Sequence, residues 1–493
     1  MFIDIKNRRE VFWEDSHIIP EHTTAELKLH HPVKHELAIT FDAPWEAAGV
    51  GYIVTVKDGD IYRMYYVCDR PATHGVFSTR VVCMMESTDY IHWTRPNLGL
   101  YEHNGSTDNN IILINQNDGK LEEPFDNFFV FIDENPACPP EERFKAIALC
   151  RNLEEKEHIH WLSPREMWCY TSADGIHFKR DFKVVDSDFV GRGGFDSTNT
   201  AWWDKDDQKY HCFVRVFMKD RVRDIKYMES TDFRNWSEPI LLNYGESEEY
   251  ELYTNHIMKY YRAPHMFIGF PMRYVQRNSL GKNFEQMNGE EGARLRKERA
   301  EKLEMRMGTA ITDGLFMCSR DGLNWKRYDE MFFEREQEHT HNWAYGDYST
   351  PIYPPIETDM PAPWDGKEIS FYLHEGACSN GVHTVYRHSI RLDGFASYHA
   401  DYDIKKVTTK SILFTGSELH LNFSTSALGW IYVDVLDANN KPLEGWHSCE
   451  LFGNTTDRTV YFGDSKDVSS LQGKVIRLQF TMRQADIYSY KFE

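Results

Sequence analysis

The sequence has no excess of positive charge and no long hydrophobic run. Its 493 residues contain 56 Lys and Arg against 77 Asp and Glu, which gives a formal net charge of −21. Nucleic-acid binding needs a basic face, so this balance argues against a nucleic-acid partner. No stretch approaches the roughly 20 consecutive apolar residues of a membrane-spanning helix, so we expect no membrane span. The N-terminus lacks the basic and then apolar segments of a secretion signal, which predicts a cytoplasmic protein unless a signal has been removed.

Paired cysteines and metal-binding motifs are also missing. The nine cysteines are scattered and include no Cys-x-x-Cys pair. Several, such as Cys68 and Cys212, lie in apolar runs, where cysteine is usually a buried free thiol. The 22 histidines include no His-Glu-x-x-His, and the close pair His339 and His341 has no evident third ligand. We therefore expect a reducing compartment, no catalytic metal and no cofactor.

Aromatic residues, in contrast, are abundant, with 13 Trp, 27 Tyr and 30 Phe. Strands favour aromatic residues, and sugar sites use them as flat stacking platforms. We expect most of them to be strand and core residues.

An internal repeat organises the chain. Four segments share the form Ser-x-Asp-x-x-x-(Trp/Phe), each after an apolar run, which predicts a strand, a tight turn and an aromatic residue that packs between sheets. The Ser and aromatic positions of the four copies are Ser87 and Trp93, Ser172 and Phe178, Ser230 and Trp236, and Ser319 and Trp325. The segment 391–395 resembles a degenerate fifth copy.

Two further strand-like runs precede each copy in the same order, for example 51–57 and 61–67 in the first unit and 351–356 and 368–373 in the fifth. Five units of antiparallel strands without helices between them predict an all-β fold, a five-bladed β-propeller.

Two segments fall outside the repeat. Residues 287–306 are charged, with Glu and Arg or Lys four residues apart, and predict a helical insertion. From 403 onward, short alternating strands predict a β-sandwich. The expected domains are therefore a propeller over 1–402 and a sandwich over 403–493, and the run 10–19 adds a strand to the sandwich or closes the last blade.

Polar clusters introduce the innermost strand of every unit, and the next strand returns to the same rim of the sheet. The clusters lie at 41–46, 125–127, 195–199, 251–255 and 345–348. Arg70, Arg151, Arg215 and Arg273 end the second strand in four units, and Glu375 takes this place in the fifth. Five aligned polar clusters predict a site in the central funnel.

The start Phe-Asp-Ala-Pro-Trp-Glu at 41–46, the Phe-Asp-Ser-x-Asn segment at 195–199 and the Ser-x-Asp turns resemble the five-bladed propeller glycosidases of glycoside hydrolase families 32, 43 and 68. The predicted C-terminal sandwich makes the layout most similar to family 32, the β-fructosidases. The Trp-Met-Asn-Asp-Pro, Arg-Asp-Pro and Glu-Cys motifs of family 32 do not occur in the chain.

The resemblance implies catalytic carboxylates. By position, Asp42 corresponds to the nucleophile or base, and Asp196 corresponds to the aspartate that stabilises the transition state. Glu251 and Glu375 are candidates for the general acid, with Asp347 as a third. Sugar contacts are expected from the remaining polar and aromatic residues of the clusters and strand ends, namely Trp45, Glu46, Asn127, Tyr253, Asn255, Arg273, Trp343 and Asp347.

The sequence thus predicts a glycoside hydrolase that acts on an oligosaccharide with paired carboxylates. Two alternatives stay open: a non-catalytic carbohydrate-binding propeller, and a phosphorylase or other transferase whose rim arginines receive phosphate.

Overall fold

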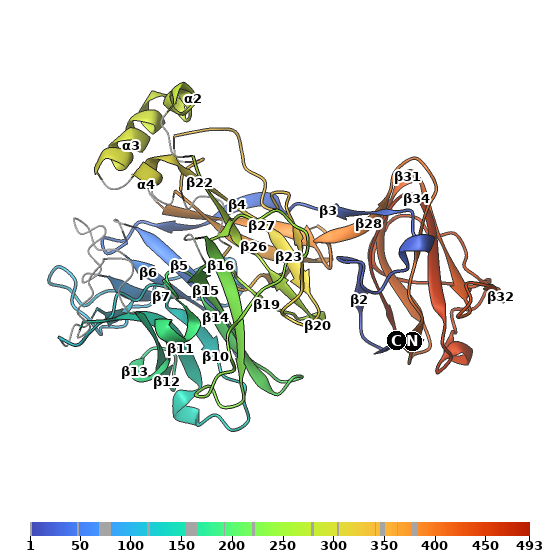
Figure 1. The fold of residues 1–493 in the computed structure, drawn as a ribbon, viewed down its shortest axis with the longest axis horizontal. Coiled ribbons are helices and arrows are strands. Elements are labelled where there is room, and N and C mark those ends of the chain that lie inside the picture. The colour runs from blue at the N-terminus through green and yellow to red at the C-terminus, as the bar shows by residue number, and fades with distance from the viewer. Residues whose placement is uncertain are drawn as a thin grey trace.

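Most of the regular secondary structure in the chain is β-strand, which confirms the expectation of a mostly β protein (Figure 1). No described helix is long and apolar enough to span a membrane. The computed structural model describes residues 2–46, 49–68, 80–115, 119–153, 165–191, 193–218, 222–277, 281–302, 305–340, 342–345, 351–361, 363–376 and 383–493.

Three antiparallel sheets follow one another at the start of the larger body, and in each of them the strands pair in chain order. The first consists of β5 (Val50–Asp58), β6 (Ile61–Cys68), β7 (Val81–Ser87) and β8 (Ile111–Ile114). The second consists of β10 (Phe129–Ile132), β11 (Phe144–Asn152), β12 (Arg165–Ser172) and β13 (Lys179–Asp186), with β9 (Leu121–Glu122) beside β11. The third consists of β14 (Thr200–Asp204), β15 (Lys209–Phe217), β16 (Arg223–Ser230) and β17 (Ile240–Leu241).

The fourth unit is divided into two sheets by a helical insertion. Its main sheet consists of β19 (Met258–Tyr260), β20 (Ala263–Gly269), β23 (Phe316–Ser319) and β24 (Trp325–Tyr328). A three-stranded sheet next to the insertion consists of β18 (Glu251–Leu252), β21 (Met272–Gln276) and β22 (Ala310–Gly314). Between β21 and β22 lie the helices α2 (Lys282–Gln286), α3 (Gly289–Lys302) and α4 (Met305–Thr309), where the charge pattern predicts them. They project from one side of the body (Figure 1).

The fifth sheet joins distant parts of the chain. It consists of β25 (Ile356–Asp359), β26 (Lys367–Glu375), β27 (His383–Arg391) and β4 (Val33–Phe41). The strand expected at 351–356 is wrong, because Pro351 and Tyr353 form only isolated bridges and the strand begins at Ile356. Two prolines, Pro354 and Pro355, immediately precede it, and proline cannot donate a ladder hydrogen bond.

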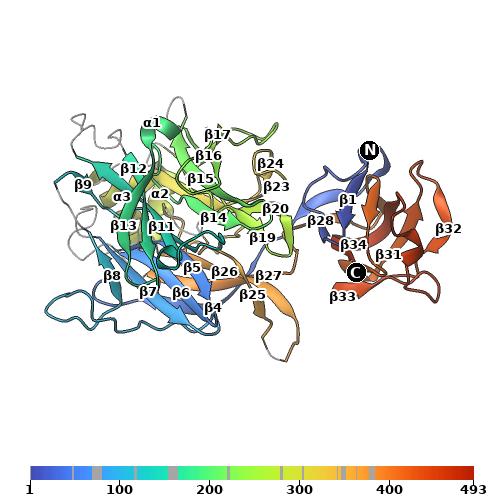
Figure 2. The same cartoon turned by 90° about the horizontal axis from the view of Figure 1, so that it is seen from below.

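The smaller body contains both chain ends (Figures 1 and 2). Its strands include N-terminal as well as C-terminal segments, and β2 from the run 10–19 pairs with β34. The largest sheet consists of β3 (Glu26–Leu29), β28 (Ala396–Ala400), β34 (Arg477–Phe492), β31 (Leu419–Leu436) and β32 (Pro442–His447), with β2 (Glu10–Val11), β29 (Lys405–Thr408) and β33 (Asn454–Thr459) beside them. β1 (Ile3–Lys6) pairs in parallel with β30 (Ile412–Phe414).

The four Ser-x-Asp segments form the same turn. In the third copy, the Ser230 hydroxyl accepts hydrogen bonds from the backbone N–H groups of Asp232 and Phe233, at 3.2 and 3.0 Å. The Asp232 carboxylate accepts from the N–H groups of Arg234 and Asn235. Equivalent bonds occur at Ser87, Ser172 and Ser319. Each turn therefore satisfies its own backbone donors.

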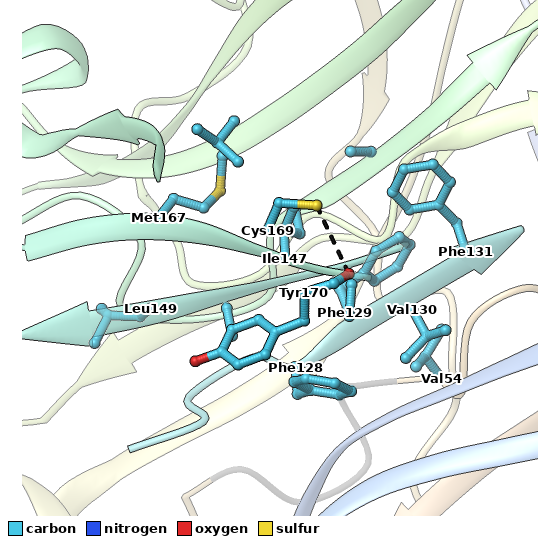
Figure 3. Close-up of a cluster of buried hydrophobic side chains, with 14 of the residues drawn as sticks. Val54, Phe128, Phe129, Val130, Phe131, Ile147, Leu149, Met167, Cys169 and Tyr170 are labelled. Carbon is cyan, nitrogen blue, oxygen red and sulfur yellow. Dashed lines mark hydrogen bonds between the residues drawn. The ribbon is translucent and has the colours of Figure 1, made fainter. Parts of the chain in front are cut away.

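Buried apolar side chains fill the space between neighbouring sheets. Figure 3 shows the core around β10, β11 and β12, where Val54 from the first sheet meets the second. The aromatic residues of the repeat belong to these layers, as Phe178 does. Packing between the sheets fixes the edges on which the polar clusters lie.

Candidate functional site

Five arginines lie at the same end of the strands in the first three sheets, and we call them the arginine cluster. This end of the strands is called the arginine-lined edge below. In an antiparallel sheet, the end of the second strand and the start of the third meet at the same edge. Arg151 ends β11 and lies directly opposite Arg165, which begins β12. Arg215 near the end of β15 and Arg223 at the start of β16 take similar places in the third sheet. The cluster consists of Arg80, Arg151, Arg165, Arg215 and Arg223.

Two aspartates from equivalent loops reach the same edge. Asp126 precedes β10 and Asp196 precedes β14. Each loop is tied to the second strand of its sheet, because Leu149 N–H bonds the Asp126 carbonyl at 3.3 Å and Phe195 N–H bonds the Arg215 carbonyl at 3.0 Å.

The Asp196 carboxylate is held by two arginines. Its Oδ2 lies 2.7 Å from Arg215 Nη2 and 3.3 Å from Arg165 Nη1, while 34% of its side chain remains exposed. Burial raises the pKa of Asp196, but the charges and hydrogen bonds of these two arginines outweigh it and hold the pKa well below its ordinary value. Asp196 is therefore ionised at neutral pH.

Asp126 has the opposite electrostatic character. Its side chain is almost completely buried, and burial raises its pKa. Arg80, which forms an ion pair with Asp126, lowers the pKa, and the negative charge of Asp196 raises it again. The net direction is upward, so the two neighbouring carboxyl groups have pKa values that are moved apart.

Aromatic rings and a glutamate continue the site toward the fourth unit. The Tyr253 ring lies 5.2 Å from the Arg223 guanidinium and 5.7 Å from that of Arg215. Its hydroxyl accepts a hydrogen bond of 2.7 Å from Tyr345. Arg223 also forms an ion pair with Glu251. Of the residues chosen from the sequence, the structure thus brings Asp196, Tyr253 and Glu251 together.

The residues chosen at 42–46 lie in a different environment. Asp42 is largely exposed, and its partner is Arg95, at 3.4 Å. Glu46 is completely buried and binds Arg95 and the Tyr66 hydroxyl, so its contacts are internal. Trp45 donates its indole N–H to Asn110. None of the contacts described for Asp42 joins it to Asp126 or Asp196.

Three other chosen residues are engaged elsewhere in the described structure. Glu375 lies 2.7 Å from Lys34 in the fifth sheet. The Arg273 guanidinium binds the Asp313 carboxylate through two nitrogens. Trp343 packs near the helical insertion, where its carbonyl accepts a bond from Arg296.

The two asparagines chosen for sugar hydroxyls are buried and bind backbone carbonyls. Asn127 donates to the Phe195 carbonyl, and Asn255 donates to those of Thr198 and Phe213, at 3.1 and 3.2 Å. Their amide N–H groups thus link neighbouring sheets, and the Asn127 Oδ1 accepts no hydrogen bond from the described residues, so a contact of these side chains with a sugar hydroxyl stays a prediction. Asp347 lies outside the described residues.

Sequence reasoning missed Asp126, Arg80, Arg165 and Arg223. Asp126 was visible as the counterpart of Asp196, since both follow a phenylalanine before an innermost strand. The three arginines had no such signal, because they begin or precede third strands after loops of unequal length.

One group of side chains has metal-ligand geometry. Asp204, Asp207 and His211 bring their ligand atoms within 4.8 Å of one another. The Lys259 ammonium, however, lies 3.2 Å from Asp204 and 3.1 Å from Asp207. A lysine cation thus already lies between these carboxylates and offsets part of their charge.

No protein-family model matches the sequence, and neither does any curated protein. Solved structures with a similar fold include glycoside hydrolases. A thermostable family-43 glycoside hydrolase has 14% identity and a TM-score of 0.40, covering 71% of this chain and 92% of its own. The family-93 α-L-arabinofuranosidase of Fusarium graminearum, solved with arabinobiose, has 10% identity and a TM-score of 0.37, with coverages of 78% and 94%. An α-L-arabinanase of Penicillium chrysogenum has 10% identity and a TM-score of 0.38, with coverages of 78% and 95%. At these values, the resemblances carry no weight for the chemistry of this chain.

Proposed function

We propose that the protein is a glycoside hydrolase whose two working carboxyl groups are Asp126 and Asp196. The observation that carries the proposal is their contrast: equivalent loops present both groups to one arginine-lined edge, and their pKa values are moved in opposite directions. Glycosidases need such a pair, one carboxyl protonated and one ionised, on either side of the glycosidic oxygen.

In this proposal, Asp126 is the general acid. Its raised pKa keeps a proton available for the leaving-group oxygen. Asp196, held ionised by Arg165 and Arg215, acts as the base or nucleophile on the opposite side of the sugar. The ring of Tyr253 provides an apolar surface beside them.

The proposal includes a five-bladed β-propeller and a C-terminal β-sandwich. Five antiparallel sheets, four of four strands and one of five, support the propeller. The eight-stranded sheet formed by both chain ends supports the sandwich. The boundary between propeller and sandwich stays near residue 402. Strands β1 to β3 and β28, which precede this boundary, are assigned to the sandwich because they pair with its strands.

The experiment is hydrolysis of a panel of aryl glycosides and oligosaccharides by the full chain, with Asp126→Asn and Asp196→Asn as variants. Each variant should lose about 10²–10⁴-fold in kcat/KM while its urea midpoint stays close to that of the wild type. The pKa of Asp126 is raised and that of Asp196 is lowered. The wild-type activity should therefore fall at acidic pH, where Asp196 becomes protonated, and at alkaline pH, where Asp126 loses its proton.

Asp42→Asn is the discriminating comparison. It should leave activity within a few-fold of the wild type, because Asp42 is exposed and its ion-pair partner among the described residues is Arg95. If Asp42→Asn abolishes turnover and Asp126→Asn does not, the carboxyl pair is wrong and the sequence-based assignment is preferred. Saccharide binding without any turnover would favour a non-catalytic binding protein.

A further inference from the structure

Three arginines of the site have guanidinium nitrogens that no described hydrogen bond satisfies. These nitrogens are Nε and Nη1 of Arg215, Nε of Arg223 and Nη1 of Arg165, the last of which has only the 3.3 Å ion-pair contact with Asp196 Oδ2. Only 5%, 0% and 13% of the respective side chains is exposed. A buried donor without a partner costs free energy, and for a charged group the cost is larger. Arg273, outside this cluster, directs Nε and Nη2 to the Asp313 carboxylate.

The position of these arginines adds a second cost. Arg165 and Arg151 are direct cross-strand partners, and like charges directly opposite each other destabilise a sheet. Arg151 lies 3.5 Å from Glu122, which offsets part of this repulsion. Neighbouring arginines also lower the pKa of Arg215, after burial as the larger cause. The fold thus holds several cations close together.

Positive charge exceeds negative charge here, although the whole chain has a net charge of −21. In the described part of the site, the charged groups are Arg80, Arg151, Arg165, Arg215 and Arg223 against Glu122, Asp126, Asp196 and Glu251. If Asp126 carries a proton, as the proposed mechanism requires, only three of the four carboxyl groups are negative. An anion would complete the balance.

We propose that Arg165 and Arg223 form a subsite for an oxyanion, carried as a carboxylate or sulfate ester on the saccharide substrate. The identity of the carrier rests on the proposed glycosidase function. Arginine N–H groups match the oxygens of such groups, and the bonds are charge-assisted. Arg215 has no exposed surface, so it contributes its charge from beneath and positions Asp196. The preferred substrate is therefore an acidic saccharide rather than a neutral one.

The first measurement is the thermal midpoint of the full chain in increasing sulfate, phosphate and glucuronate, with glucose and chloride as references. The three oxyanions should raise the midpoint of the wild type more than the references do. The effect should be lost in Arg165→Gln. It should be reduced in Arg165→Lys, which keeps the positive charge but not the planar guanidinium with its paired N–H donors. Arg294→Gln, on the exposed face of α3, is the control and should respond as the wild type does.

The second measurement compares aryl glycosides that differ only in a C6 carboxylate or hydroxymethyl group, in both anomers. The acidic member should have a kcat/KM about tenfold or more above the neutral one, and Arg223→Gln, which does not contact Asp196 in the described structure, should remove that preference mainly through KM.

The outcomes separate the two proposals. Equal cleavage of both glycosides without stabilisation by oxyanions overturns the subsite and leaves the hydrolase. Stabilisation that depends on Arg165, with no cleavage of any glycoside, supports the subsite and overturns the hydrolase. If neutral glycosides are turned over only when inorganic phosphate is present, the oxyanion subsite is supported. The proposal that the saccharide substrate itself carries the oxyanion is then wrong.

Discussion

Asp393 joins three parts of the chain through one buried carboxylate. Its removal should destabilise the protein, and this prediction does not depend on the identity of the substrate. Its Oδ1 lies 2.7 Å from Arg262 Nε and accepts from the Tyr260 hydroxyl at 2.6 Å, both in the fourth unit. Its Oδ2 accepts from Ser489 in β34 at 2.7 Å and lies 3.3 Å from Arg9. The side chain has no exposed surface.

Asp393→Ala would leave Arg9 and Arg262 without their common anion. Breaking a buried ion pair from one side costs about 3–5 kcal/mol, which is a large fraction of the ordinary stability of a domain. Asp393→Asn keeps the shape and should cost about 1.5–3 kcal/mol, the usual value for hydrogen bonds to a charged group. Asp60→Asn, in an exposed hairpin turn, should stay within about 0.5 kcal/mol of the wild type.

The contribution of this carboxylate should depend on pH. Burial raises the pKa of Asp393, but the charges of Arg262 and Arg9 lower it by more, so that the pKa falls from 3.8 to about 2. A carboxyl group whose pKa is lower in the folded state stabilises the fold above its unfolded pKa. This stabilisation, about 2 kcal/mol, is lost as the pH falls from about 4 to about 2.

Urea unfolding followed by tryptophan fluorescence measures these changes, since the Trp13 indole donates to the Asp393 carbonyl at 2.8 Å. The free-energy difference between the wild type and Asp393→Asn should be constant from pH 7 to pH 5 and should shrink below pH 4. A difference that does not change with pH would show that the negative charge of Asp393 is not what stabilises the junction.

Two further predictions concern the repeated turns. Ser230→Ala should lower the free energy of unfolding by about 1 kcal/mol, because two backbone donors lose their acceptor, whereas Thr231→Ala at the exposed middle position should change it little; equal losses in both variants would contradict this role of the hydroxyl. Gly175→Ala should lower the free energy of unfolding by about 2–3 kcal/mol, because φ is +74° and the new Cβ would lie 2.7 Å from Tyr65 Oη. Gly119→Ala, at φ +84° with no atom within 4 Å of the new Cβ, should lower it by only about 1 kcal/mol. Urea titrations measure both values.

The turns could be predicted from sequence because all their bonds are local. Ser230, Asp232 and the backbone N–H groups from which they accept lie within six residues, so the motif alone determines which donors are satisfied. Pairing between distant segments had no such signal. The strand β4 joins β27, more than 300 residues away, through backbone hydrogen bonds that any residue can make.

The sequence did not show which side chain of 125–127 lies beside the arginine cluster, and the reason is local. The sequence placed Asn127 in the site, whereas the side chain on the arginine-lined edge belongs to Asp126. Phe125 and Asn127 both have a left-handed backbone, with φ of 51° and 56°. Side chains therefore do not alternate as in a regular strand, and counting along the chain cannot tell which of the three faces the site.

In the proposed mechanism, equivalent loops of the repeat provide an acid and a base of the same residue type. Asp126 and Asp196 come from equivalent loops, so the backbone presents them alike. Arg80 and Arg151 lower the pKa of Asp126, and Arg215 and Arg165 lower that of Asp196, so what differs is how far burial and the neighbouring negative charge offset the arginines. Asp126 is also the more deeply buried of the two. Because burial favours the protonated form and arginines favour the ionised form, substitutions that only redistribute these arginines would change which aspartate carries the proton, while the sheets that position them stay the same.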